Sequence, residues 1–250
     1  MRLESSEALL FLSRARLIFF ADAERLCYTT GNDPAESSIP MSTDRSERLR
    51  AIRDAVVNLT ESPLFEYRRN NNYFPVIGQG DHYADIMFIG EAPGKNEAET
   101  GRPFCGASGR VLDELLASIG LNREEVYVTN ILKDRPPNNR DPLKSEIELY
   151  APFLEQQIEV IQPKVIATLG RFSMEFILRR FGAYQANQKI SQLHGAVIKV
   201  RAAYGSAAVV PLFHPAAALY NASQRETLEK DFQVLKKFDA PAQPGTMRLL

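Results

Sequence analysis

The chain of 250 residues contains only two cysteines, Cys27 and Cys105, and this scarcity limits the chemistry available to it. Two thiols cannot build a disulfide framework, and they cannot supply the four thiolates of a structural metal site. We therefore predict no metal site. A protein with so little cysteine needs no oxidising compartment, so we expect it in the cytoplasm.

The sequence also lacks a long apolar run and an excess of charge of one sign. Without 18 consecutive apolar residues, no membrane-spanning helix is expected. Ala21-Asp22-Ala23 resembles a signal-peptide cleavage site, but Arg14 and Arg16 interrupt the apolar stretch before it, so we expect no signal peptide. The net charge of −1 produces no global attraction to nucleic acid. Any such binding would need a local basic patch.

The length and the hydrophobic content of 44 % suit one globular domain with appendages. Residues 1–40 form an N-terminal extension with a polar, turn-rich end, and we predict that they are dispensable and that Met41 is the native start. A cleaner helical pattern follows Met41. We place the domain at residues 41–240 and a tail at residues 241–250.

Short apolar runs alternate with helical patterns along the domain, which is typical of a parallel sheet covered on both faces. The runs expected to be central strands are 86–89, 126–130, 165–169 and 208–212. We therefore predict an α/β fold with three layers, α/β/α, around a mostly parallel sheet of about four strands. Residues 196–200 are expected to pair with 208–212 as a hairpin.

The stretch from Asp85 to Arg110 is the centre of this pattern. Its apolar run breaks abruptly into Gly90-Glu91-Ala92-Pro93-Gly94, and a second turn follows at Gly101-Arg102-Pro103-Phe104. Open α/β sheets bind their ligands at the carboxyl ends of the strands. We therefore expect the active site on this stretch. A phosphate cradle is a weaker alternative, because neither a Walker lysine pattern nor G-x-G-x-x-G is present.

Three polar side chains follow predicted strands directly: Glu91, Asn130 and His214. In a parallel sheet the carboxyl ends of the strands share one edge, so we expect these groups to converge there. Each residue also has a structural interpretation. Glu91 could cap a helix, Asn130 could be a turn residue, and His214 could be a hydrogen-bonded core histidine.

Several segments together resemble the family 4 uracil-DNA glycosylases over roughly residues 76–236. They are GEAPG at 90–94, GRPF at 101–104, VTN at 128–130, LKDRPPNNR at 132–140, ATLGR at 167–171 and FHPAAAL at 213–219. This resemblance implies a glycosylase that flips uracil out of DNA and hydrolyses its N-glycosidic bond, leaving an abasic site. It also implies DNA as the partner, single- or double-stranded, and we expect a monomer.

The resemblance also implies roles for individual residues. Glu91 and His214 are catalytic: the carboxylate lies near the sugar, and the imidazole donates to uracil O2. The implied uracil-binding residues are Gly90 and Ala92 at the pocket floor, Phe104 stacked on the base, Asn130 at the uracil edge and Glu97 against C5. The implied wedge in the DNA is Leu219, and we expect the basic residues Arg102, Lys133, Arg135 and Arg140 to contact DNA. The basic residues could instead form a solvated face, because Asp134 and Asp141 lie among them.

One departure from the family concerns a cofactor. Family 4 members typically hold a [4Fe–4S] cluster on four cysteines, whereas the corresponding positions here are Leu59, Ser62, Asp134 and Tyr150. We therefore expect no cluster and no other cofactor, with apolar or hydrogen-bonded packing in its place. The loss also keeps an alternative open, in which the chain is a non-catalytic module that binds DNA or damaged bases.

Overall fold

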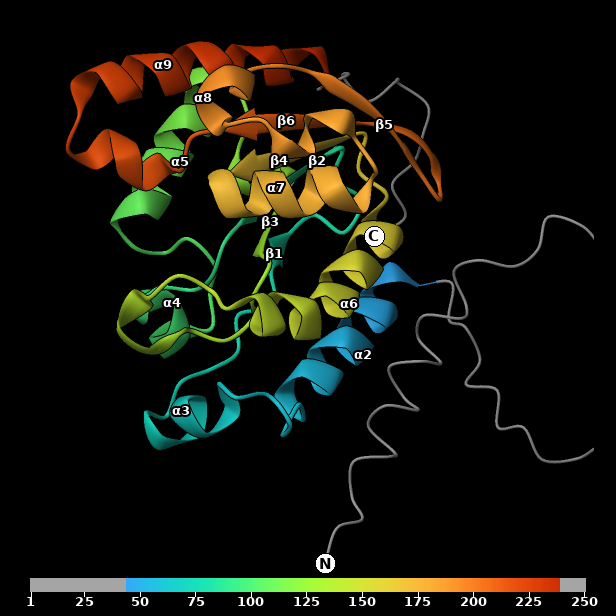
Figure 1. Cartoon of the computed structure of the whole chain (residues 1–250), viewed down its shortest axis with the longest axis vertical. Helices are drawn as coiled ribbons and strands as arrows, with labels where there is room; N and C mark the ends of the chain where they lie inside the picture. The colour runs from blue at the N-terminus through green and yellow to red at the C-terminus, as the bar shows by residue number, and fades with distance from the viewer. Residues whose placement is uncertain (1–43, 239–250) are drawn as a thin grey trace, which may run out of the picture. The chain divides into compact units, whose positions relative to one another are not determined.

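The computed structural model describes residues 44–238 (Figure 1). The predictions for residues 1–40 and 241–250 lie outside the described residues, and the domain bounds stay a prediction. None of the helices in the described part is long and apolar enough to cross a membrane.

The sheet has six strands in the order β1-β3-β2-β4-β6-β5, so the prediction of about four strands was wrong in number. The strands are β1 (Gln79–Gly80), β2 (Ile86–Gly90), β3 (Tyr127–Asn130), β4 (Val165–Leu169), β5 (Ile198–Ala202) and β6 (Gly205–Leu212). β3, β2, β4 and β6 run parallel and match the four predicted strands. The additional two are antiparallel edge strands, and β5 is the predicted hairpin partner of β6.

Helices connect the parallel strands. The α-helices of the described residues are α2 (Arg45–Val57), α3 (Phe65–Asn70), α4 (Lys95–Thr100), α5 (Ala107–Ser118), α6 (Lys144–Ile161), α7 (Arg171–Arg180), α8 (Ile190–Leu193) and α9 (Ala222–Phe232). Short 3₁₀ turns complete the connections, among them η4 (Pro215–Leu219) directly after β6.

Alternate residues of β2 face opposite layers, as the two-residue period of a strand requires. Ile86 and Phe88 pack in an apolar cluster with residues of α5 and α9. Met87 and Ile89 pack in a second cluster with residues of α2, α6 and α7. In Figure 1, β6 lies between α9 and α7. Both faces of the sheet are therefore covered, which confirms the predicted three-layer α/β/α arrangement.

The parallel register brings the carboxyl ends of the central strands to one edge of the sheet. Gly90 at the end of β2 is the Cα partner of Asn130 at the end of β3, and Leu169 of β4 is the partner of Leu212 of β6. The amide of Gly170 continues this contact by donating to the carbonyl oxygen of Leu212 at 2.9 Å. The segments that follow these four strands therefore begin beside one another.

Candidate active site

Gly90, Asn130 and Phe104 meet at the end of β2. A Cβ atom on Gly90 would overlap the Asn130 side-chain oxygen and lie 2.7 Å from the Phe104 ring, so only glycine lets these two side chains approach. Phe104 has a backbone φ of 49°, in the left-handed region that a bulky side chain rarely adopts. Such a conformation costs about 1–3 kcal/mol and is concentrated at functional sites.

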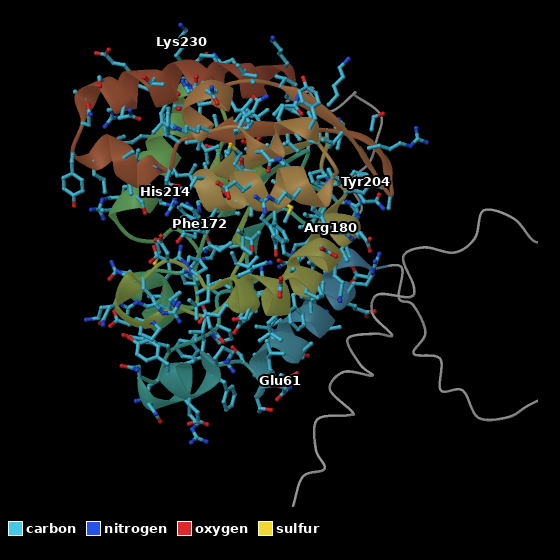
Figure 2. The ribbon with its side chains drawn as sticks, in the orientation of Figure 1. Glu61, Phe172, Arg180, Tyr204, His214 and Lys230 are labelled. Atoms are coloured by element: carbon cyan, nitrogen blue, oxygen red, sulfur yellow. The ribbon has the colours of Figure 1, made fainter. Side chains whose placement is uncertain are left out.

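His214, which lies just after β6, also contacts Phe104. Its ring stacks on Phe104 with centroids 5.7 Å apart and planes inclined by 28°. Its Cβ atom lies 3.5 Å from the position that a Cβ on Gly170 would take, so His214 also lies beside the start of α7 (Figure 2). The Phe104 ring therefore contacts both the end of β2 and the segment that follows β6.

The environment of His214 determines its tautomer. Burial lowers the pKa of the imidazole to about 4, so the ring is neutral at physiological pH. The backbone N–H of Ala216 donates to Nδ1 at 3.1 Å, which makes Nδ1 the acceptor. The single ring proton is therefore on Nε2, which is left as a hydrogen-bond donor.

Glu91 follows β2 directly and is partly buried. Burial raises the pKa of its carboxyl to about 7; the charge of Asp141 raises it further, and Arg171 acts in the opposite direction. Asp141 and Arg171 form an ion pair of 2.7 Å with each other on the surface. A carboxyl group with a strongly raised pKa, placed beside a charged pair at the end of a parallel strand, is a candidate for acid–base or electrostatic catalysis.

Glu97 and Ala92 support the loops around these groups. The buried Glu97 accepts a hydrogen bond from the backbone N–H of Gly106 at 3.1 Å and lies close to Gly94, so it joins the two glycine-rich turns. Ala92 packs against the apolar cluster that contains Leu132. Both residues therefore stabilise the loops.

The residues predicted to contact DNA have different surroundings. Arg102 is exposed, and 37 % of Leu219 is exposed at the end of η4. Arg135 donates to the hydroxyl groups of two tyrosines and to Asn139 Oδ1, the last at 2.8 Å. Arg140 donates to the buried carboxylate of Glu146 at 2.8 Å. The two arginines thus already have protein partners, while Arg102 and Leu219 face solvent.

The prediction that Lys133 contacts phosphate was wrong. Its side chain is fully buried, and Nζ donates to Thr129, Asn130 and Gln157, so it cannot reach a DNA backbone. The motif LKDRPPNNR has the composition of a polar surface loop, but its first residues turn back into the core. The apolar residues Ile131 and Leu132, immediately before Lys133, were the available signal.

The positions expected to replace the iron–sulfur ligands are occupied by a buried polar network. Tyr150 donates to Asp134 at 2.6 Å and lies 2.8 Å from the hydroxyl of Ser62. Arg68, which the sequence did not reveal, donates to both carboxylate oxygens of Asp134 at 3.1 Å. Leu59 packs in the apolar cluster that contains Tyr150. These side chains bond to one another and offer no thiolate, so they do not fit a [4Fe–4S] cluster.

Comparison with known proteins identifies the family. The family model described as the Uracil DNA glycosylase superfamily matches residues 77–238. The chain is 41 % identical over 192 residues to a type-4 uracil-DNA glycosylase of Sulfurisphaera tokodaii, covering 76 % of this chain and 84 % of that protein. It is 44 % identical over 178 residues to a type-4 uracil-DNA glycosylase of Archaeoglobus fulgidus, covering 71 % and 87 %.

A third relative is similar over nearly its whole length. A type-4 uracil-DNA glycosylase of Thermotoga maritima is 37 % identical over 200 residues, which is 78 % of this chain and 96 % of that protein. The matched region includes every residue of the site described above, from Gly90 to His214. The chain therefore belongs to the Uracil DNA glycosylase superfamily, among its type-4 members.

Proposed function

We propose that this protein is a DNA repair glycosylase that flips uracil out of DNA and hydrolyses its N-glycosidic bond, leaving an abasic site. One observation carries the proposal: at one edge of the sheet, Asn130 and Phe104 both lie against Gly90, and the Phe104 ring stacks on His214. Glu91 is adjacent to this group. A base within a duplex is out of reach, so the enzyme extrudes it at a cost of a few kcal/mol.

Asn130 and Phe104 recognise the extruded base. Phe104 stacks on the ring, and the amide of Asn130 both donates and accepts, so it pairs with uracil O4 and N3–H. Cytosine presents the opposite pattern, which would leave buried partners unsatisfied at about 1–3 kcal/mol each. Glu97 acts against C5, where thymine carries a methyl group, and Gly90 and Ala92 form the pocket floor.

His214 stabilises the departing base. Breaking the glycosidic bond leaves negative charge on uracil O2, and the Nε2–H of a neutral imidazole donates to that oxygen. This donor acts in the manner of an oxyanion hole, in which one hydrogen bond is worth about 10²–10³ in rate. The bond between Ala216 N–H and Nδ1 supports this role, because it keeps the ring proton on Nε2.

Glu91 acts on the sugar. When ionised, its carboxylate stabilises the oxocarbenium-like transition state or positions the attacking water. The raised pKa of about 7 supports a group that titrates near physiological pH, so its charged fraction increases through neutrality.

We further propose that Arg102, Arg135 and Arg140 contact phosphates, and that Leu219 fills the gap left by the flipped base. The exposure of Leu219 and Arg102 supports this assignment. Single- and double-stranded DNA are both substrates, because extrusion from a single strand costs less and needs the same pocket. The protein acts as a monomer.

We also propose that the protein holds no iron–sulfur cluster. The hydrogen-bonded network of Ser62, Arg68, Asp134 and Tyr150 supports this proposal, because it fills the expected site with groups that are poor cluster ligands. Iron analysis and a visible spectrum of protein purified without oxygen test it. Stoichiometric iron with broad thiolate-to-iron absorbance would contradict it.

An excision assay tests the main proposal. A labelled oligonucleotide with one uracil is incubated with the protein and then treated with alkali, which cleaves the strand at abasic sites. We expect scission at the uracil only, and none in an oligonucleotide with cytosine or thymine at that position. Clean binding without any scission would contradict the proposal and favour a non-catalytic DNA-binding module.

A further inference from the structure

Lys133 is a fully buried lysine whose hydrogen bonds all lie within the protein. Its Nζ atom is 2.7 Å from Thr129 Oγ1, 2.7 Å from the backbone oxygen of Asn130 and 2.6 Å from Gln157 Oε1. Lysine is almost never fully buried unless it is paired with an acid, and none of these three partners is a carboxylate. Such a burial is costly, so the lysine needs a specific explanation.

All three partners of Nζ are acceptors. The Thr129 hydroxyl donates its own hydrogen to the carbonyl oxygen of Ile77 at 2.6 Å, so toward Lys133 it can only accept. The Gln157 amide nitrogen donates to Ile77 and to Tyr127, which turns its Oε1 toward the lysine. Three acceptors match the three N–H groups of an ammonium ion, whereas a neutral amine would satisfy only two of them.

Burial opposes the charged form of Lys133. It lowers the pKa of Lys133 well below the usual value of a lysine, while the three acceptors favour the charged form. The Thr129 hydroxyl and the Gln157 amide each make a second hydrogen bond, so neither can turn away from the amine without losing it. The Lys133 amine is therefore held in one position by three acceptors, two of which are themselves fixed by a second hydrogen bond.

Lys133 lies next to the backbone of Asn130, whose side chain is proposed to recognise the uracil edge. Asn130 ends β3, and the chain after it returns so that Lys133 reaches the carbonyl oxygen of Asn130 itself. The same segment is bonded to β2, because the amide of Ile131 donates to Gly90 and that of Leu132 donates to Glu91, both at 3.1 Å. A fixed Asn130 carbonyl restrains the peptide plane at this residue, and with it the Cα position from which the side chain that lies against Gly90 projects.

We propose that Lys133 is a positioning residue for Asn130, which it orients for recognition of the uracil edge through the backbone of β3. This inference rests on the proposed function. It predicts that loss of the amine reduces excision by about 10–100-fold, as expected for a small displacement of a recognition group, and that this loss is transmitted through Asn130.

A double-mutant cycle tests the inference. Lys133→Met, Asn130→Ala and the double variant are compared with the wild type in single-turnover excision of uracil, with enzyme in excess and at a temperature where melting curves show all four proteins folded. We expect Lys133→Met to slow the wild type by about 10–100-fold and the Asn130→Ala variant by less than about threefold. Equal losses in both backgrounds would show a general structural role and overturn the inference.

Two further variants provide a substitute for Lys133→Met and a control for lost stability. Thr129→Val removes one acceptor while keeping the side-chain shape, and it replaces Lys133→Met in the same cycle if that variant does not fold. Val160→Ala removes buried apolar volume from α6 and serves as the stability control, for which we expect equal effects in both backgrounds. An inactive wild type would contradict the proposed function, whereas an active wild type with an additive cycle would contradict only the role of Lys133.

Discussion

His214 shows how a single side chain can gain a defined chemical role from its surroundings. Its neutral state follows from burial, and its tautomer follows from one backbone hydrogen bond. We predict that His214→Ala lowers the single-turnover rate of uracil excision by about 10²–10³-fold, because it removes the donor to O2. DNA affinity, measured by fluorescence anisotropy, should change little. Excision at the wild-type rate would contradict the proposed role.

The raised pKa of Glu91 predicts the pH dependence of the reaction. Excision should increase with pH and level off above about 7, because the carboxylate is the active form. Asp141→Asn removes a negative charge that raises this pKa, so the midpoint should move to lower pH. Arg171→Gln removes the opposing charge, so its midpoint should move to higher pH. Identical profiles for both variants and the wild type would show that another group controls the rate.

The same pKa predicts a cost in stability. A carboxyl group with a folded-state pKa of about 7, against 4.5 ordinarily, binds its proton more tightly in the folded protein, so its stabilising contribution is present below pH 4.5 and is lost as the pH rises through 7. Glu91→Gln should therefore be more stable than the wild type at pH 8, by roughly 1–2 kcal/mol after solvent screening. At pH 5 the difference should be much smaller. Denaturant unfolding at the two pH values measures it, and a Gln variant that is less stable at pH 8 would contradict the assignment.

The sequence predicted which residues stand at strand ends, but it could not predict how their neighbours are buried. Glu91, Asn130 and His214 each follow an apolar run directly, and this position alone brings them toward one edge. Lys133 was misassigned because a lysine in a polar segment is usually exposed. Its burial depends on Gln157 and Ile77, which are distant in sequence and supply partners only in the folded chain.

At the scale of elements, the network around Asp134 ties α3 to α6 and to the segment after β3. Arg68 of α3 pairs with Asp134, which in turn accepts from Tyr150 of α6, and both charged side chains are at most 7 % exposed. Arg68 also donates to the carbonyl oxygens of Val56 and Val57 at the end of α2. Three helices thus depend on one buried ion pair.

Breaking this ion pair should destabilise the fold. We predict that Arg68→Met lowers the free energy of unfolding by about 3–5 kcal/mol, because it leaves the Asp134 carboxylate buried without its cation. The additional change Asp134→Leu should recover part of the loss. The surface pair of Arg53 and Asp54 offers a matched control, since Arg53→Met should cost less than about 1 kcal/mol. Equal effects of the two arginine substitutions in urea unfolding would contradict this account.

The sequence indicated the long elements more clearly than the short ones. The four parallel strands lie where the apolar runs predicted them. β1 has two residues and pairs with β3 through Gln79 and Gly80, and the predicted count of about four strands left it out. β5 alternates between buried and exposed residues as an edge strand does, and it lies at Ile198–Ala202, two residues beyond the predicted range 196–200.

At the scale of the whole molecule, the described residues contain a six-stranded sheet, helices on both of its faces and every proposed site residue. We therefore predict that a chain beginning at Met41 folds and excises uracil at a rate within about twofold of the full chain, since every proposed site residue lies within residues 44–238. Melting curves and the excision assay compare the two chains. Loss of activity in a folded, shortened chain would show that residues 1–40 take part in the reaction.

The central claim is that Glu91, Asn130 and His214 meet around one extruded uracil. A crystal structure of the Glu91→Gln variant with uracil-containing DNA tests it most directly. We predict that the uracil ring stacks on Phe104, with the Asn130 amide at O4 and N3 and His214 Nε2 at O2, each within hydrogen-bonding distance. A uracil that stays stacked in the DNA, or that binds where Asn130 and His214 cannot touch it, would contradict the account.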